Sequence, residues 1–382
     1  MESRFKVAQI GSRGIPGHRG GVERVVEAVA PRLAARGHDV TVYCASWSRE
    51  KAPTWRGVTL KYVPSVKSKH LDTLLRSFVA TLGAMFGPAD ILHYHGSGSA
   101  PLAALARLAG KKVVVTVHGA DWARRKWGAL GRWFLQFGEW AALKIPHQTI
   151  VVGPDLKSGL DRIYGTDTLF IPNGTEERPK RPAKAILDLG LAARGYVLFL
   201  ARLVPEKQCH TLIEAWMSLK DKGDLKLAIA GPVWHSVEYA ASLKEQAKDD
   251  PSVLFLGEVS EEILEELYSN CISYVLPSEV EGMSLSLLDA MAFGACIICS
   301  DIPANAYVVS DAGLTFPAGD VGALRARLQE VISDPAHAQH LRDAALRRIN
   351  NEFSWDQIAQ RWEEAYRRVM VEGARLVEVK KA

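Results

Sequence analysis

The chain has 382 residues, 48% of them hydrophobic, a length and composition that fit two or three domains with apolar cores. No stretch reaches the roughly 18 apolar residues of a membrane-spanning helix, and the N-terminus lacks the apolar core of a signal peptide. We therefore expect a cytoplasmic protein. Its five cysteines are odd in number and scattered, which indicates reduced core thiols.

The net charge of +4 conceals a difference between the two parts of the chain. Residues 1–170 hold 24 Lys and Arg against 12 Asp and Glu, a net of +12, so the remainder carries −8. The basic part suits nucleic acid or an anionic membrane surface as a partner. The two parts are therefore expected to serve different partners.

The first residues predict a strand at 5–10, an amphipathic helix at 22–36 and a strand at 40–44, one unit of a parallel α/β sheet. The glycines of the loop GSRGIPGHRGG do not have the G-x-G-x-x-G spacing, and no acidic residue follows the second strand. A dinucleotide-binding dehydrogenase is therefore rejected. Gly20 and Gly21, at the helix start, still suit the close approach of a phosphate.

Strands predicted at 91–94 and 113–117 end in the sequences HYHGSGS and HGAD. Ligands of open α/β sheets gather at the carboxyl ends of strands, which makes His93, His95, His118 and Asp121 candidates. His93 and His95 share a strand face, but the sequence offers no nearby acidic or cysteine third ligand. A structural role for one of them is favoured over a metal site.

Residues 122–144, WARRKWGALGRWFLQFGEWAALK, interleave basic residues with tryptophans. This pattern is typical of a segment that lies on anionic lipid. An ordinary helix whose aromatic side chains line the core of the first domain explains it equally well.

A linker rich in charge and proline is predicted at 176–184, followed by a second α/β domain. Its predicted strands are 196–201, 225–230, 253–256 and 272–276, its predicted helices are 212–219 and 285–292, and a helical tail covers 321–333, 336–353 and 355–371.

Two loops of this second domain carry charges that suit a nucleotide sugar. Arg202 and Lys207 follow its first strand, where two cations can bind a diphosphate and stabilise its charge as it leaves. Glu281 and Asp289 flank the backbone of Gly282 to Ser284 at a helix start, which can bind an anion. Carboxylates on either side of an anion site suit a ligand with hydroxyl groups flanking a phosphate.

The run EGMSLSLLD at 281–289 resembles the E-x7-E signature of retaining glycosyltransferases of family 4, with Asp289 in place of the second glutamate. Arg202 and Lys207 match the R-x4-K pattern of that family, and V-H-G at 117–119, P-N-G at 172–174 and FPAGD at 316–320 match further motifs. The first glycine-rich loop resembles that of rhamnosyltransferase-like members, of the exopolysaccharide and O-antigen type.

The resemblance implies the GT-B fold, in which two Rossmann-like domains with parallel sheets face each other across a cleft. Residues 1–175, joined by a C-terminal helix at about 356–382, would bind the acceptor, and residues 190–355 would bind the nucleotide sugar. The implied catalytic residues are His118, Arg202, Lys207 and Glu281, with Glu281 on the donor sugar. Donor binding is implied for Gly20, Gly21, Asn173, Gly282, Met283, Ser284, Leu285 and Asp289, the last on the ribose, and acceptor binding for His95 and Asp121.

The implied function is retaining transfer of a hexose from a nucleoside diphosphate sugar to a glycan or lipid-linked acceptor in cell-surface polysaccharide synthesis. A uridine diphosphate sugar is favoured and deoxythymidine diphosphate rhamnose is the other option. The chain has no Asp-x-Asp, so we expect no metal and no cofactor. Peripheral contact with the inner membrane face is expected, and nucleic acid is not.

Two alternative functions are compatible with this sequence. A sugar-nucleotide epimerase could use the same fold and diphosphate site, but it would need no acceptor surface. A nucleic-acid-binding protein could use the basic part, but it would leave the paired carboxylates without a purpose.

Overall fold

The computed structural model describes residues 4–17, 20–47, 51–65, 72–120, 122, 128–233 and 236–379, with side chains up to residue 371. The chain divides into two compact units. The first comprises Met1–Asn173 together with Trp355–Ala382, and the second comprises Gly174–Ser354.

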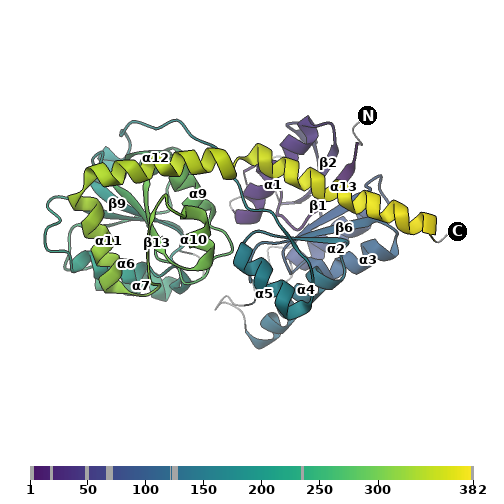
Figure 1. The fold of residues 1–382 in the computed structure, drawn as a ribbon, viewed down its shortest axis with the longest axis horizontal. Coiled ribbons are helices and arrows are strands. Elements are labelled where there is room, and N and C mark those ends of the chain that lie inside the picture. The colour runs from purple at the N-terminus through teal and green to yellow at the C-terminus, as the bar shows by residue number, and fades with distance from the viewer. Residues whose placement is uncertain are drawn as a thin grey trace. The chain divides into compact units, whose positions relative to one another are not determined.

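The first unit is built on a sheet in the order β3-β4-β2-β1-β5-β6-β7-β8. Strands β1, β2 and β6 of this sheet are labelled in Figure 1. All of its neighbouring strands pair in parallel except β3 and β4, which form an antiparallel pair. Its strands are β1 (Lys6–Ile10), β2 (Asp39–Ala45), β3 (Thr54–Trp55), β4 (Val58–Val63), β5 (Ile91–His95), β6 (Lys112–Val117), β7 (Gln148–Val151) and β8 (Leu169–Phe170).

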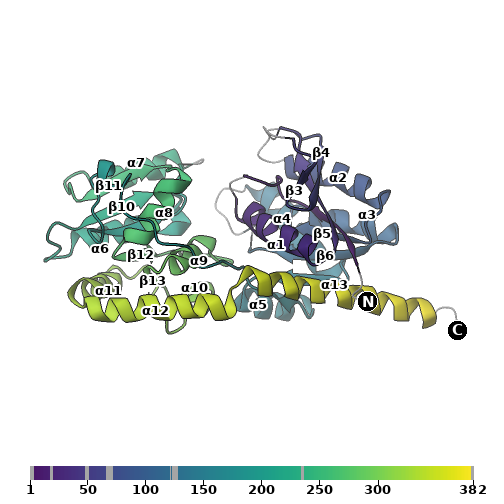
Figure 2. The same ribbon diagram turned by 90° about the horizontal axis from the view of Figure 1, so that it is seen from above.

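Helices cover both faces of this sheet. One face packs its alternate apolar residues against α2 (Asp72–Met85), α3 (Ala103–Leu108), α4 (Ala129–Lys144) and α5 (Pro154–Tyr164). On the other side, α1 (Gly21–Ala35) packs against the last helix, α13 (Trp355–Val379), and both views show these two helices side by side (Figures 1 and 2).

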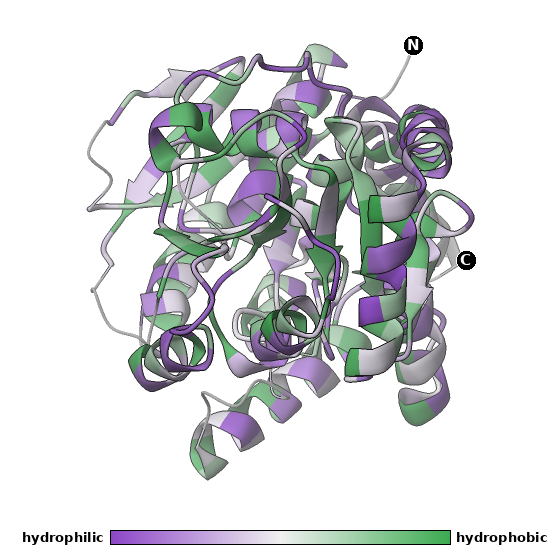
Figure 3. Cartoon of the chain, turned by 90° about the vertical axis from the view of Figure 1, so that its left-hand side faces the viewer, coloured by the Kyte–Doolittle hydropathy of each residue, from purple (hydrophilic) through white to green (hydrophobic). Residues whose placement is uncertain are grey.

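The second unit has a parallel sheet in the order β11-β10-β9-β12-β13-β14. Its strands are β9 (Tyr196–Leu200), β10 (Lys226–Ala230), β11 (Val253–Gly257), β12 (Ser273–Leu276), β13 (Cys296–Ser300) and β14 (Leu314–Phe316). Its helices are α6 (Cys209–Met217), α7 (Val237–Gln246), α8 (Glu261–Asn270), α9 (Leu285–Ala292), α10 (Pro303–Val309), α11 (Val321–Ser333) and α12 (Pro335–Glu352). Hydrophobic residues are concentrated along the strands, whereas the helices also carry hydrophilic residues (Figure 3).

Both sheets reverse their strand order at one point. In the first unit the reversal lies between β1 and β5, and in the second unit it lies between β9 and β12. The loops that leave two such strands diverge to opposite sides, which opens a crevice at the carboxyl edge where doubly wound sheets bind ligands. The topology therefore marks one ligand-binding edge in each unit.

Residues 174–189, which include the linker predicted at 176–184, belong to the second unit. Arg178 and Arg181 form ion pairs with Glu265 of α8, at 3.2 and 2.8 Å. The carboxylate of Glu266 accepts the backbone N–H groups of Lys184 and Ile186. The predicted linker forms no helix or strand, and these contacts hold it on α8.

A buried carboxylate fixes α13 to the first unit. Glu363 is 4% exposed, and its oxygens pair with Arg367 at 2.5 Å, Arg36 at 3.4 Å and His38 at 3.5 Å. Because removing one partner of a buried charge leaves the other uncompensated, these groups stabilise the docked helix as a set.

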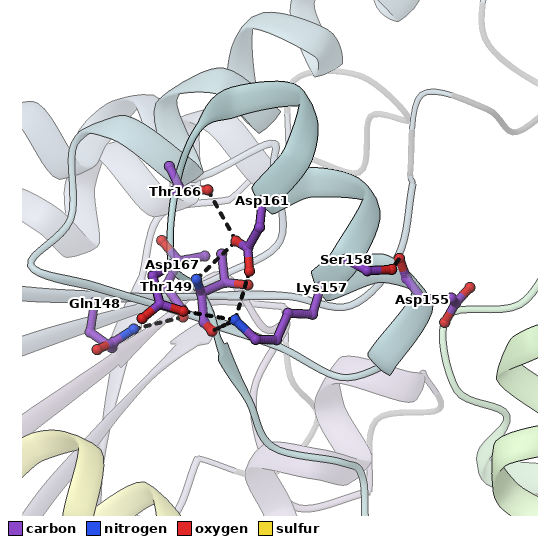
Figure 4. Close-up of polar contacts among 9 residues, drawn as sticks. Gln148, Thr149, Asp155, Lys157, Ser158, Asp161, Thr166 and Asp167 are labelled. Atoms are coloured by element: carbon purple, nitrogen blue, oxygen red, sulfur yellow. Dashed lines mark hydrogen bonds and ion pairs between the residues drawn. The ribbon is translucent and has the colours of Figure 1, made fainter.

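The C-terminal turn of α5 is held by one lysine (Figure 4). Lys157 donates to Asp161 at 2.6 Å, Asp167 at 2.9 Å and the carbonyl of Thr168 at 2.5 Å. Asp161 in turn accepts the backbone N–H of Thr168 at 2.9 Å. These contacts fix the loop that leads into β8.

Candidate active site

Two loops of the second unit are joined at the point where its strand order reverses. The loop after β9 contains a 3-10 turn at Pro205–Lys207, and the loop after β12 precedes α9. The backbone N–H of Glu279 donates to the carbonyl of Glu206 at 3.0 Å, and the hydroxyl of Tyr274 donates to the carbonyl of Leu200 at 3.2 Å. These bonds hold the predicted cations and the predicted carboxylate on one edge.

Lys207 and Glu281, 74 residues apart in sequence, form a direct ion pair. Their side chains are 13% and 10% exposed, so solvent screens the pair only partly. Arg202 is half-buried in the same loop as Lys207 and makes polar interactions of its own. The structure thus places a lysine, an arginine and a glutamate around the carboxyl edge of β9 and β12.

The turn between Glu281 and α9 is held by serine hydroxyls. Ser284 caps α9 by accepting the backbone N–H of Leu287 at 3.4 Å, and its hydroxyl lies 3.0 Å from that of Ser286. Met283 is buried, and Gly282 and Leu285 are half-buried. The cap therefore engages the N–H of Leu287, which is not one of the Gly282 to Ser284 N–H groups that the sequence offers for an anion.

Asp289, the second predicted carboxylate, lies on α9 and is 9% exposed. The hydroxyl of Thr175 donates to it at 3.4 Å. Thr175 belongs to the second unit. Asn173 is 5% exposed and belongs to the first unit, whose segment Met1–Asn173 ends at this residue. Thr175 carries no sequence motif of its own, and only its place two residues after Asn173 points to it.

The other predicted residues lie in the first unit. His118 follows β6 and is half-buried, and its Nε2 atom lies 3.2 Å from Nδ1 of His95, the last residue of β5. His95 is 3% exposed, so the structure places this predicted acceptor contact beneath the surface. Asp121 lies outside the described residues.

Burial keeps the two strand histidines neutral. It lowers the pKa of His93 to about 3, with a smaller contribution from the charge of His118. The pKa of His95 falls well below its usual range, again chiefly through burial and then through the neighbouring His93 and His118. Transfer of a charged imidazolium into an apolar interior is unfavourable, which is the physical origin of both shifts.

Gly20 and Gly21 begin α1, as the sequence predicts, but a carboxylate occupies this helix start. Glu23 is 7% exposed, and its Oε1 accepts the backbone N–H of Arg13 at 2.9 Å. A Cβ atom at position 20 would lie 1.9 Å from its Oε2. The close approach that glycine permits here is to Glu23.

Among the described residues, no three His, Cys, Asp or Glu side chains are grouped so that they could hold a metal ion. The cysteines are all buried and reduced, as the sequence indicates. Burial raises the pKa of the Cys271 thiol to about 12 and that of Cys296 to about 11. Such thiols are poor nucleophiles at neutral pH, so they take no part in the site.

The two parts of the chain match two family models. Residues 19–178 match the model described as Glycosyltransferase Family 4, and residues 191–348 match the one described as Glycosyl transferases group 1. The Family 4 match begins just before α1 and ends a few residues past the boundary between the units. The group 1 match covers most of the second unit.

Two characterised relatives illustrate the range of the likeness. The chain is 28% identical to O-antigen chain mannosyltransferase B from Escherichia coli over 194 residues, which cover 50% of this chain and 51% of the relative. It is 26% identical to the GDP-mannose-dependent alpha-(1-6)-phosphatidylinositol monomannoside mannosyltransferase of Mycolicibacterium smegmatis, over 85% of this chain and 88% of the relative.

Solved structures share the fold over nearly the whole chain. Sucrose-phosphate synthase from Thermosynechococcus elongatus superposes with a TM-score of 0.82 at 23% identity, covering 97% of this chain and 100% of the other. HepE from Anabaena, solved in complex with UDP-glucose, superposes with a TM-score of 0.77 at 16% identity, covering 95% and 99%.

The paired parallel sheets, the two family matches and the structural neighbours agree with one another. This chain is a glycosyltransferase of the family 4 and group 1 type, with the GT-B fold.

Proposed function

We propose that this protein is a retaining hexosyltransferase whose second unit binds a nucleoside diphosphate sugar at the carboxyl edge of β9 and β12. The observation that supports this most strongly is the ion pair between Lys207 and Glu281, with Arg202 in the same loop. A diphosphate needs cations, a hexose needs hydrogen-bond acceptors for its hydroxyl groups, and both kinds of group meet here.

The two cations are proposed to bind the diphosphate. Negative charge grows on the leaving diphosphate as the glycosidic bond to it breaks, and fixed positive charge at that position stabilises the transition state more than the ground state. Arg202 and Lys207 are rooted in a short loop whose backbone is tied to the neighbouring loop, so little reorganisation is required. We expect activity to survive excess chelator, and a strict requirement for added Mg²⁺ or Mn²⁺ would contradict this assignment.

The carboxylates are proposed to bind the two sugars of the donor. Glu281 would accept hydroxyl groups of the transferred hexose, and Asp289, oriented by Thr175, would accept those of the ribose. In the absence of donor the Glu281 carboxylate satisfies Lys207. Donor binding would therefore replace part of that ion pair by a contact from Lys207 to the diphosphate.

The relatives support a hexose donor and leave its identity open. One relative is a mannosyltransferase of O-antigen chains, another is a GDP-mannose-dependent enzyme, and a structural neighbour was solved with UDP-glucose. We retain a UDP-sugar as the favoured donor and dTDP-rhamnose as the second option. The proposed acceptor is a glycan or lipid-linked glycan of the cell surface.

The proposal is tested by the fate of the donor sugar without any acceptor. We expect slow hydrolysis in which the anomer released first, identified by proton NMR before mutarotation, has the configuration of the donor. Release of the opposite anomer would contradict retention. Accumulation of an altered sugar with no transfer to any glycan would favour the sugar-nucleotide epimerase instead.

A second part of the proposal concerns the membrane, and exposed aromatics on α4 support it. Trp133, Phe137 and Trp140 stack along one face of this helix and are 62%, 42% and 44% exposed. Their exposure is against the interpretation that they line the core. No helix of the described part combines the length and apolar character needed to cross a bilayer.

Basic residues precede this face in sequence. Residues 124–126 are Arg-Arg-Lys and lie outside the described residues, and residues 1–170 carry the net charge of +12. Each basic residue near an anionic surface contributes about 1 kcal/mol to binding. We propose that α4 and this basic segment dock the first unit on an anionic membrane, where a lipid-linked acceptor would be met.

Liposome sedimentation tests the docking. Wild-type protein is expected to sediment with vesicles containing phosphatidylglycerol at low salt, and Trp133→Ser combined with Trp140→Ser is expected to weaken this binding. Leu108→Ser, at an exposed apolar position on α3, is the matched control and should bind like the wild type. Failure of the wild type to bind at low salt would indicate a soluble acceptor.

A further inference from the structure

Two buried polar side chains of the second unit form hydrogen bonds that are not part of the proposed donor site. Ser300 is the last residue of β13, Asn305 lies on α10, and both are 0% exposed. The side-chain nitrogen of Asn305 lies 3.0 Å from the hydroxyl oxygen of Ser300, which lies 2.5 Å from the carbonyl oxygen of Ser278. Ser278 is in the loop between β12 and α9 that carries Glu281. The two side chains therefore support this loop from the neighbouring strand and helix.

The carbonyl group of Ser278 belongs to a peptide group that is hydrogen-bonded at both ends. The N–H of the same peptide group is that of Glu279, and it donates to the carbonyl of Glu206 at 3.0 Å. Glu206 directly precedes Lys207 in the loop after β9. One peptide group thus connects Ser300 of β13 with the loop that carries Lys207.

The peptide group between Glu206 and Lys207 continues this chain of hydrogen bonds. Its carbonyl accepts the N–H of Glu279, and its own N–H, that of Lys207, donates to the carbonyl of Val204 at 3.0 Å. The nitrogen of the following peptide group belongs to Pro205, which has no N–H to donate, so the chain ends there. A continuous chain of hydrogen bonds therefore runs from α10 to the backbone of Lys207, the cation of the ion pair in the proposed donor site.

Backbone groups fix the direction of this chain. Two oxygen atoms 2.5 Å apart need a hydrogen atom between them, and the carbonyl of Ser278 has none, so the hydroxyl of Ser300 donates. That hydroxyl has a single hydrogen, so its oxygen must accept from Asn305, whose amide nitrogen therefore faces Ser300. The N–H of Glu279, further along the chain, can only donate. Every bond therefore points the same way, and in such chains each bond is strengthened by about 10–30% through polarisation.

We propose that Ser300 and Asn305 are positioning residues, which hold the loop of Glu281 and the loop of Lys207 at a fixed separation. The ion pair between Lys207 and Glu281 joins the same two loops in the absence of donor. Because a bound diphosphate would draw Lys207 away from that carboxylate, the backbone chain is a connection that persists while the donor is bound. The effect on turnover rests on the proposed donor site, whereas the connection between the loops does not.

Hydrogen–deuterium exchange, measured by mass spectrometry on the protein without ligand, tests this connection. Ser300→Ala removes the hydroxyl group, and exchange should rise by about 2- to 10-fold, the factor expected for loss of one hydrogen bond, in fragments containing residues 277–284 and 203–208. Asn305→Ala leaves the hydroxyl bond in place, so it should affect the same fragments by a smaller factor. The rise in residues 203–208 is decisive, because the chain reaches this segment through the backbone rather than through either substituted side chain.

Ser273→Ala is the matched control. Ser273 begins β12, is 0% exposed like Ser300, and donates to the carbonyl of Cys296, the first residue of β13, at 2.9 Å. It therefore makes the same kind of buried bond at the opposite ends of these two strands. Its loss should lower stability by a similar amount but leave turnover and the exchange of both fragments unchanged.

Turnover measures the consequence for the donor site. Hydrolysis of UDP-glucose and of GDP-mannose without acceptor should fall by about 10- to 100-fold in Ser300→Ala, because displacement of reacting groups by about 1 Å can cost about 100-fold in rate. Ser300→Thr keeps the hydroxyl group and should retain most of the activity.

Three results would count against parts of this account. Unchanged exchange of residues 203–208 in Ser300→Ala, or an equal rise in Ser273→Ala, would show that Ser300 has only a local structural role. Faster exchange with unchanged turnover would likewise overturn the positioning role. If the wild type hydrolysed neither donor while exchange changed as expected, the result would contradict the proposed donor and support the connection between the loops.

Discussion

At the scale of single residues, the proposed donor site depends most on the ion pair between Lys207 and Glu281. Glu281→Gln removes the anion that Lys207 contacts in the absence of donor and keeps a side chain of the same shape. We therefore expect the dissociation constant for the nucleoside diphosphate to stay the same or to fall. Turnover should fall by about 10²- to 10³-fold, the size of effect seen when one charge-stabilising group is lost.

Calorimetry with the nucleoside diphosphate and initial-rate kinetics measure the two effects separately. Asp289→Ala is the informative comparison, because loss of the ribose contact should weaken nucleotide binding first. If Glu281→Gln abolished nucleotide binding while transfer of the sugar continued, its assignment to the sugar would be wrong.

Sequence patterns located the charged residues of the site but not their partners. R-x4-K and the acidic run at 281–289 placed Arg202, Lys207 and Glu281 because their spacing fits loops at strand ends. Thr175, which donates to Asp289, was missed, since a threonine in a loop has no distinctive pattern. Only the folded structure brings its hydroxyl group to α9, 114 residues further along the chain.

The boundaries of individual elements followed the sequence closely where caps and breakers are strong. The helix predicted at 285–292 matches α9, and the helix at 321–333 matches α11, because Ser284 and Asp320 cap them. The segment at 176–184, where charge and proline predict a linker, forms no helix or strand but is held by ion pairs. Ion pairs to α8 are long-range contacts that no local pattern encodes.

Gly231 is required at the end of β10 by two independent constraints. Its φ of +144° is a conformation that residues with a side chain rarely adopt, and a Cβ atom there would lie 1.8 Å from the carbonyl oxygen of Ala201. Gly231→Ala should lower the free energy of unfolding of the second unit by at least about 1–3 kcal/mol, the cost of such backbone strain alone. It should also displace the loop that carries Arg202.

Denaturant unfolding measures this loss. Gly322→Ala, in the first turn of α11, is the matched control because a Cβ atom there makes only ordinary contact at 3.4 Å. If the two variants were equally stable, the backbone at position 231 would not require glycine.

The buried histidines of β5 make the stability of the first unit depend on pH. An unfolded histidine binds a proton below about pH 6.5, whereas folding lowers the pKa of His93 to about 3 and that of His95 well below its usual range. Between these values the unfolded state binds more protons than the native state. Burial of the two neutral imidazole rings therefore makes its full contribution to the free energy of unfolding above about pH 6.5. This contribution is lost as the pH falls from there toward about 3.

Each such histidine can change the free energy of unfolding by up to about 1.4 kcal/mol per pH unit. Denaturant unfolding at about pH 7, 6 and 5, on either side of the usual histidine pKa, should show a progressive loss for the wild type. His93→Gln should show a shallower dependence. A wild-type stability that does not change between these pH values would mean that the two rings are protonated in the folded protein.

At the scale of the whole molecule, the fold class followed from alternation of strands and helices in each part of the chain. The strand orders of the two sheets come from the structure. That the last helix joins the first unit is implied by the family resemblance, and the contacts that hold it there, such as Glu363 with Arg36, are seen only in the structure.

The central claim is that the second unit binds a nucleotide sugar through Arg202 and Lys207, and a thermal shift measurement tests it most directly. UDP-glucose, GDP-mannose, ADP-glucose and dTDP-rhamnose would each be added, with chelator, to the wild type, to Arg202→Ala combined with Lys207→Ala, and to Lys248→Ala as an exposed-lysine control. A ligand present at 100 times its dissociation constant raises the free energy of unfolding of the protein by about 2.7 kcal/mol. We predict that at least one of these donors raises the unfolding temperature of the wild type and the control, and that the double variant loses this shift. A donor that stabilised the double variant as much as the wild type would contradict the claim.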